Sequence, residues 1–313
     1  MVAKRLVWCG LILVAGAALV WAAEPSGGDG RSGGSNRAAR GALRDSDKLP
    51  WPEPKAAAVK ELHDELLAEL PRDQFHIVRI GPWLVATDMD KRNLQGFLDS
   101  TIKFYAARIQ RQLFDKPLGE PVKVYLFKNR ASYEKWTMKL FGEKPTTPYG
   151  WFSRRHRGMY MNIATGGGTL LHEMTHAMTE ADWPGIPAWM NEGLGSLFEA
   201  SSRTREGRVI GITNWRLAGL QKELKAGTAP KFSDLLKMDD NQFYGAASGD
   251  NYASARYLMQ YLQSKGQLET FYKRVRDKKD KDAFASLRHV FGNKLTVDQI
   301  EKACYDWVKT LRQ

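Results

Sequence analysis

The stretch GGGTLLHEMTHAM, residues 166–178, decides what the rest of the chain must supply. It places His172 and His176 four residues apart, with Glu173 directly after the first histidine. On a helix, residues four apart lie on the same face, one turn from each other. Two imidazoles in this arrangement can both bind one cation at the bond length of roughly 2.0–2.1 Å that zinc requires. The spacing therefore predicts part of a metal site rather than an incidental pair of polar residues.

The neighbouring residues predict that this stretch is helical. Leu171, Met174 and Met178 supply an apolar face at helical spacing. Thr165 is the predicted N-cap, and the three glycines after it allow another backbone to pass closely. Glu173 is rotated by about 100° from the first histidine. It should point beside the metal, where a general base acting on a metal-activated water is needed.

A catalytic zinc site commonly takes three protein ligands, so the two histidines require a further group. We predict Glu192 as this ligand. It lies in PAWMNEGLGSLFEA, residues 187–200, which has a helical pattern with Pro187 in its first turn. A turn between two packed helices would place its carboxylate opposite the imidazoles. Asp182, six residues after His176, is the alternative ligand.

HEMTH followed by WMNEG resembles the gluzincin metallopeptidases, the clan of thermolysin-like and aminopeptidase-like enzymes. Over residues 158–200 the chain is more closely similar to a bacterial family of exported proteins called peptidase-MA-like, including the group labelled DUF1570. The similarity extends weakly to YASARYLMQYL, residues 252–262, and to the C-terminal ACYDWVKTL. The resemblance implies that His172, His176 and Glu192 bind one Zn²⁺ ion and that Glu173 is the general base.

The chain departs from two related patterns. The metzincin pattern requires glycine at position 179, which is Thr179, although Asp182 does occupy the position of its last ligand. The thermolysin pattern places an aspartate four residues after the ligand glutamate, where it orients a histidine. This position is Ser196, so the group that fixes the imidazole is unassigned. Glu199, further along the same helix, is either its replacement or a plain surface residue.

Peptide hydrolysis also needs a donor for the oxyanion that develops on the substrate. Gluzincins often use a tyrosine or histidine from a downstream helix, and the candidates are Tyr244, Tyr252 and Tyr257. Tyr252 follows a Gly-Asp-Asn turn and opens an apolar helix, so we predict it as the second catalytic residue. The alternative for Tyr257 is an aromatic side chain packed in the core.

Hydrophobic periodicity predicts an α+β fold: a small mixed β-sheet, the zinc-binding helix packed beneath it, and a mainly helical C-terminal half. The resemblance implies a thermolysin-like arrangement of these parts. Helices are expected over residues 55–70, 90–114 and 130–141, and over most of 213–313. Strands are expected in FHIVRIG, WLVATDM and VKVYLF, and in a hairpin of YGWFS and GMYMNI around the basic turn RRHR. In the gluzincin clan the strand before the metal helix, here GMYMNI, borders the cleft and pairs with the substrate.

Composition divides the chain into four segments. Residues 1–23 carry Lys4 and Arg5 before an apolar run and are predicted to be a signal peptide or N-terminal anchor. Residues 24–50, rich in glycine, serine and charge, should be a flexible linker. Residues 51–180 form the expected α/β part that ends in the metal helix, and residues 181–313 the helical part that carries the third ligand. We expect residues 51–120 to be integral, because their strands would otherwise lack partners.

The signal-like N-terminus predicts a protein outside the cytoplasm: periplasmic, secreted or membrane-tethered. The formal charge of +12 favours contact with acidic envelope components. Nucleic acid is not expected as a partner, because the densest basic run, residues 273–281, is broken by aspartates and no recognised motif is present. Removal of the signal would leave Cys304 as the one cysteine, which excludes an intramolecular disulfide.

These observations predict an exported zinc metallopeptidase that acts on peptide or protein substrates. Glu173 would serve as the general base, and membrane contact would be made only through an uncleaved N-terminal segment. The alternative is a catalytically silent zinc-binding or envelope-binding protein on the same fold.

Overall fold

The computed structural model describes residues 48–313 apart from 143, 146, 154, 155 and 157. The expected signal or anchor (1–23), the linker over 24–47 and the three arginines of the basic turn lie outside these residues. Within the described ranges, no helix has both the length and the apolar character needed to cross a membrane.

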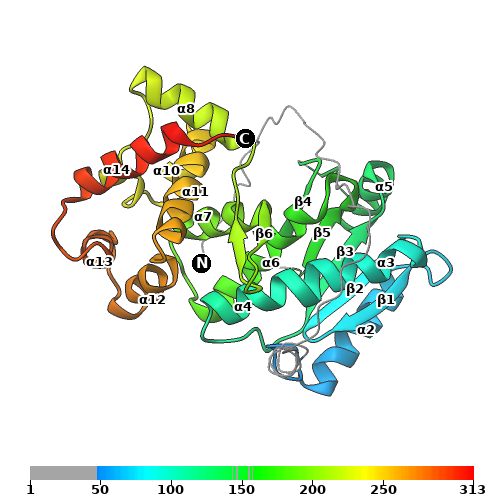
Figure 1. Ribbon diagram of the computed structural model, residues 1–313. Helices are drawn as coiled ribbons and strands as arrows, with labels where there is room; N and C mark the ends of the chain where they lie inside the picture. Colours follow the sequence, from blue (N-terminus) through cyan, green and yellow to red (C-terminus); the bar gives the residue numbers. More distant parts are fainter. Residues whose placement is uncertain (1–47, 143, 146, 154–155, 157) are drawn as a thin grey trace, which may run out of the picture.

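A five-stranded mixed sheet occupies the first half of the described chain (Figure 1). Its strands are β1 (His76–Ile80), β2 (Trp83–Thr87), β3 (Val122–Phe127), β4 (Gly150–Ser153) and β5 (Gly158–Asn162). They lie in the order β1-β2-β3-β5-β4, with antiparallel β1/β2 and β4/β5 pairs around parallel β2/β3 and β3/β5 pairs. The strands expected from the alternation are therefore confirmed. Because β2 pairs with β3, residues 51–120 are an integral part of the fold, as expected.

The two faces of the sheet pack against different helices. Val85 and Val124 face the layer formed by α3 (Lys91–Leu98), η1 (Asp99–Ala106), α4 (Ala107–Leu113) and α6 (Gly167–Asp182). Leu84 and Tyr125, each the neighbour of one of these valines, face the other way. They pack with α2 (Ala56–Glu69) and α5 (Arg130–Phe141). This alternation follows from the two-residue period of a strand, and it places the histidine-bearing helix against one face of the sheet.

The helix expected over residues 90–114 is one continuous run whose middle turn widens into the π-helix η1. Its buried residues Leu94, Leu98, Ile102 and Ala106 follow one another in steps of four. A strict 3.6-residue turn would rotate these residues gradually off the buried face. The wider π-turn keeps them all on the sheet side.

The metal helix α6 begins one residue later than predicted. Thr165 lies in the short 3₁₀ turn η2 (Ile163–Thr165), and the N-cap is Gly166 with φ +99°. The hydroxyl of Thr165 does not cap α6 because it donates to the carbonyl oxygen of Asn162 at 2.7 Å. The glycines have a steric role in the first turn. A Cβ on Gly168 would lie 2.2 Å from the carbonyl oxygen of Glu199, so the first turn of α6 runs directly against the end of the following helix.

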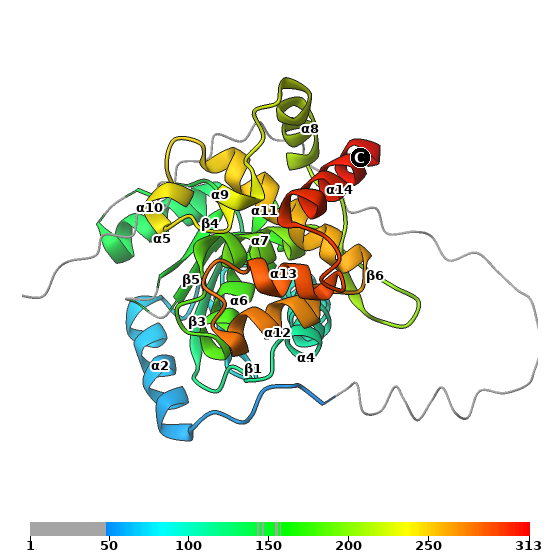
Figure 2. The ribbon, with the colours of Figure 1, turned by 90° about the vertical axis from the view of Figure 1, so that its left-hand side faces the viewer.

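The C-terminal half is mainly helical, as expected (Figure 2). Its helices are α7 (Ala188–Glu199), α8 (Arg216–Ala226), α9 (Phe232–Leu235), α10 (Asp240–Phe243), α11 (Ser248–Ser264), α12 (Leu268–Lys278), α13 (Phe284–Val290) and α14 (Val297–Thr310). A small hairpin of β6 (Ser201–Arg203) and β7 (Val209–Gly211) follows α7 and was not expected.

One hydrophobic cluster extends from Trp51 to Val308, and the expected boundary near residue 180 falls inside α6.

Candidate metal centre

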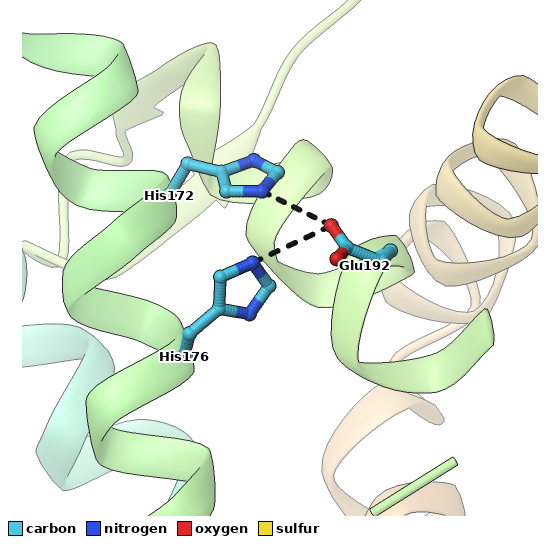
Figure 3. A group of neighbouring side chains, drawn as sticks. All are labelled: His172, His176 and Glu192. Atoms are coloured by element: carbon cyan, nitrogen blue, oxygen red, sulfur yellow. Dashed lines mark hydrogen bonds and ion pairs between the residues drawn. The ribbon is translucent and has the colours of Figure 1, made fainter. Parts of the chain in front are cut away.

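Three side chains from two packed helices converge on one point (Figure 3). His172 and His176 extend from α6, and Glu192 extends toward them from α7. The Oε2 atom of Glu192 lies 3.2 Å from Nε2 of His172 and 3.4 Å from Nε2 of His176. The sequence predicted this grouping, including the glutamate from the second helix.

The geometry of the group fits a small tetrahedral cation. One ligand atom from each residue lies within 4.8 Å of the other two. Ligand atoms bound at roughly 2.0–2.1 Å around a tetrahedral zinc ion are about 3.4 Å apart, which matches the 3.2 and 3.4 Å separations at Glu192. Two imidazole nitrogens and one carboxylate oxygen are also a donor set that zinc accepts in catalytic sites. The group therefore could hold a metal ion.

Electrostatics keep the glutamate of this group ionised. Burial by itself would raise the pKa of Glu192, but charge and hydrogen bonding from His176 and His172 outweigh it and hold that pKa well below its usual value. Burial likewise opposes the charge on His176, but the facing Glu192 carboxylate raises its pKa to about 9. The carboxylate thus meets positive charge in this pocket, as it would when facing a cation.

Gly195 allows His172 to lie directly against α7. A Cβ at position 195 would be 3.0 Å from Nε2 of His172 and 3.1 Å from two of its ring carbons. Such contacts are tighter than real Cβ atoms normally make. The absence of a side chain at this position therefore sets how closely the imidazole approaches the helix that carries Glu192.

Glu173 occupies the position beside the histidines that a general base would need. The backbone N–H of Phe152 in β4 lies near its carboxylate and is one of the groups that lower the pKa of Glu173. Burial raises the pKa of Glu173, more than the charges of the two histidines lower it. The catalytic role of Glu173 remains a prediction, and the structure adds its proximity to Phe152 of the sheet.

One prediction about the sheet is wrong. GMYMNI was expected to border the cleft, but β5 lies between β3 and β4 and both of its edges are paired. The strand at this edge of the sheet is β4, whose Phe152 lies near Glu173. The order was misjudged because sequence adjacency to the metal helix does not determine which member of a hairpin lies outermost.

Glu199 lies behind His172, on the opposite side of the ring from Glu192. Its Oε2 is 4.0 Å from Nδ1 of His172 and 2.6 Å from Nη1 of Arg216. Burial would raise the pKa of Glu199, but the charges of Arg216 and His172 outweigh it and lower the pKa. Glu199 is thus an ionised group beside the imidazole and not a plain surface residue. The hydroxyl of Ser196 is buried and has no hydrogen-bond partner among the described residues.

The three tyrosine candidates occupy different places. Tyr244 donates its hydroxyl hydrogen to Oε1 of Glu192 at 2.7 Å. Tyr257 is fully buried, with its hydroxyl against the backbone of Asn214. Tyr252 is partly buried, and its ring lies 6.3 Å from that of Tyr244. The expected catalytic role of Tyr252 remains a prediction.

Asp182 belongs to a different cluster, so the alternative third ligand is wrong. One of its oxygens accepts hydrogen bonds from the backbone N–H groups of Asp115 and Lys116, at 2.9 and 2.7 Å. The other accepts from the Tyr272 hydroxyl and from Arg276, at 2.8 and 2.6 Å. Both oxygens are therefore used to join α6 to the loop after α4 and to α12.

Three contacts of the site were not found from the sequence: Arg216 on Glu199, Phe152 on Glu173 and the hydroxyl of Tyr244 on Glu192. No pattern in the sequence around Arg216 indicated a contact with Glu199. Tyr244 was considered only as an oxyanion donor, since a sequence separation of 52 residues gives no indication of a contact with the third ligand.

Comparison with known proteins finds a family model of undescribed function that matches the part of the chain containing this site. Residues 168–285 match the model of DUF1570, a protein family of unknown function. The solved structure of native yeast LTA4 hydrolase is weakly similar, with 14% sequence identity and a TM-score of 0.42. That alignment covers 73% of this chain and 38% of the other, so the present chain spans less than half the length of that protein. No curated protein sequence matches the chain.

Proposed function

We propose that this chain is an exported zinc-dependent metallopeptidase of the gluzincin type, with Glu173 as its general base. The observation that supports this most strongly is the convergence of His172, His176 and Glu192 within ligand distance of one another. Glu173 lies on the same helix as the two histidines, which is the arrangement that hydrolysis through an activated water requires.

A zinc ion bound to this group would polarise the scissile carbonyl and make a water molecule more acidic. The remaining steps belong to the protein. Glu173 takes a proton from the attacking water as the new C–O bond forms at the carbonyl carbon. It then passes that proton to the nitrogen as the C–N bond breaks, so that the products are a carboxylic acid and an amine.

The free edge of β4 supports a peptide as the substrate. An extended chain can pair with an unpaired strand through backbone hydrogen bonds. Phe152 of the same strand lies near Glu173, so a peptide added there would lie alongside the proposed base. Tyr252 is the proposed donor to the oxyanion, in a cluster of aromatic rings that also contains Tyr244.

Export and partners form part of the same proposal. Residues 1–23 have the composition of a signal peptide or anchor, which would place the enzyme in the periplasm, outside the cell or tethered to the membrane. Its substrates would be peptides or proteins, and its positive charge would favour contact with acidic envelope components rather than with nucleic acid.

The substitution Glu173→Gln tests the mechanism. It removes the base and keeps the size of the side chain, so zinc content should stay at the wild-type level. Peptide hydrolysis should fall by about 10²–10⁴-fold, the usual contribution of a general base. Glu134→Gln is the matched control, because this glutamate pairs with Arg130 on the distant helix α5.

A Glu173→Gln enzyme with full activity would refute the mechanism. If the wild-type protein binds zinc stoichiometrically and cleaves no member of a broad peptide library, the alternative of a catalytically silent zinc-binding protein is supported instead.

A further inference from the structure

We propose that Tyr244 is a positioning residue that sets the orientation of the third ligand, Glu192. The inference rests on the proposed metal site and assigns it a part that the sequence did not indicate. The Tyr244 hydroxyl holds Oε1 of Glu192 at 2.7 Å, while Oε2 faces both histidines. The two oxygens of one carboxylate are thus given two different partners.

This division matters because a carboxylate can otherwise rotate and present either or both of its oxygens. A hydroxyl donor bound to Oε1 leaves Oε2 as the atom available to a cation. Groups that hold metal ligands in place typically contribute 10–100-fold to metal affinity. A tyrosine on this glutamate is therefore expected to act on metal binding first, and on turnover only as a consequence.

Tyr244 directly follows a short helix whose N-terminus is stabilised by a capping box. α10 (Asp240–Phe243) is capped by Asp239, whose side chain accepts from the Gln242 backbone while the Gln242 side chain accepts from the Asp239 N–H. This reciprocal pair satisfies two backbone donors of the helix start. These two hydrogen bonds stabilise the four-residue helix α10, which is directly followed by Tyr244.

The end of α10 is fixed by Asn251 from α11. The buried Asn251 side-chain amide donates to the carbonyl oxygen of Phe243 at 3.0 Å, next to Tyr244 in the chain. A longer contact of 3.4 Å reaches the carbonyl of Gln242. α11 also packs along α7. The same helix therefore contacts both α7, which carries Glu192, and α10, which precedes Tyr244.

Neighbouring rings limit the movement of the tyrosine itself. Phe243 is fully buried, and its ring meets that of Tyr244 edge to face at 5.3 Å and 88°. The ring of Tyr252 lies 6.3 Å away on the same cluster. A side chain packed in this way loses little further freedom when its hydroxyl binds Glu192, so the contact is preorganised.

The test compares the zinc affinity of Tyr244→Phe with that of the wild-type chain, by competition with a chromophoric chelator. The variant removes one hydroxyl and keeps the ring, and we expect its zinc dissociation constant to rise by about 10–100-fold. The absorption spectrum of the Co²⁺ form should change as well. Tyr305→Phe is the control, because it removes a hydroxyl that bonds the backbone carbonyl of Pro230, away from the metal group. Its zinc affinity should stay within about twofold of wild type.

A second variant tests whether Asn251 affects zinc binding through Tyr244. Asn251→Ala should weaken zinc binding in the wild-type background and have no further effect in the Tyr244→Phe background, because the two residues share one route. Equal losses in both backgrounds would overturn the proposal. It would also be overturned if Tyr244→Phe binds zinc as tightly as wild type but turns over more slowly, since that result would make the hydroxyl an oxyanion donor. A wild-type chain that binds no zinc would refute the proposed metal site as a whole.

Discussion

At the scale of single residues, Gly195 and Gly193 are two residues apart on α7, so they lie on nearly opposite faces of the helix and make different contacts. A Cβ on Gly195 would press on the His172 ring at 3.0 Å. A Cβ on Gly193 would instead meet the Ala255 carbonyl and the Met259 side chain, each at 3.1 Å, where α7 packs on α11. The first glycine therefore accommodates a metal ligand, and the second accommodates a helix contact.

This difference predicts separable effects of the same substitution. Gly195→Ala should displace the imidazole and weaken zinc binding by roughly tenfold, as loss of ligand positioning does. Gly193→Ala should leave zinc affinity unchanged and lower the free energy of unfolding by about 1–3 kcal/mol through overpacking. Chelator competition and urea unfolding measure the two quantities. A Gly195→Ala protein with wild-type zinc affinity would show that the close approach to His172 has no role in binding.

The grouping of His172, His176 and Glu192 could be predicted from the sequence, but the residues that contact this group could not. His172 and His176 are related by local helix geometry, and Glu192 follows after one turn and part of a second helix. Arg216 and Tyr244 reach the site across separations of 17 and 52 residues from their partners. Such contacts depend on how α8 and α10 pack, and no local pattern in the sequence encodes that packing.

At the scale of elements, Asp182 joins three segments rather than binding metal. It is fully buried and pairs with Arg276 of α12, whose guanidinium also contacts Asp115 and Asp277. Its other oxygen receives the backbone N–H groups of the loop that follows α4. The end of α6 is therefore held by a charge network, which keeps the helix that carries both histidines in place.

Asp182→Asn should destabilise the fold without affecting metal content. Removing the charge of a buried pair leaves Arg276 without its buried partner and should cost about 3 kcal/mol of unfolding free energy. Asp277→Asn is the matched control, because that exposed carboxylate pairs with the same arginine and should contribute less than about 1 kcal/mol. Denaturant unfolding with zinc analysis of both variants measures this. Loss of zinc from an Asp182→Asn protein that remains folded would restore this aspartate as a candidate ligand.

Elements with a strong hydrophobic period were predictable, and those fixed by packing were not. Alternation in VKVYLF and the four-residue spacing of Leu62 and Leu66 correctly gave β3 and α2. The three-residue strands β6 and β7 are too short to show any period. The π-helix η1 could not be predicted, because the four-residue spacing of its buried residues also fits an ordinary α-helix.

At the scale of the whole molecule, the candidate centre lies where the sheet-containing half meets the helical half. His172 and His176 belong to the helix that packs on the sheet, whereas Glu192 belongs to the helix that packs on α11. One core runs through both halves, so the distance between the ligands is set by the packing of the complete fold. The metal group is therefore a property of the assembled chain and not of the HEMTH segment alone.

The most direct test of this account is elemental analysis of the purified chain beside its His172→Ala and Glu192→Ala variants. We expect about one zinc ion per wild-type chain and loss of that ion in both variants, each of which should remain folded. The Glu192→Ala result carries the most information, because this residue joins the site only through the packing of α7 on α6. A wild-type chain that stays free of metal when offered zinc, or a folded Glu192→Ala chain that keeps its ion at full affinity, would contradict the central claim.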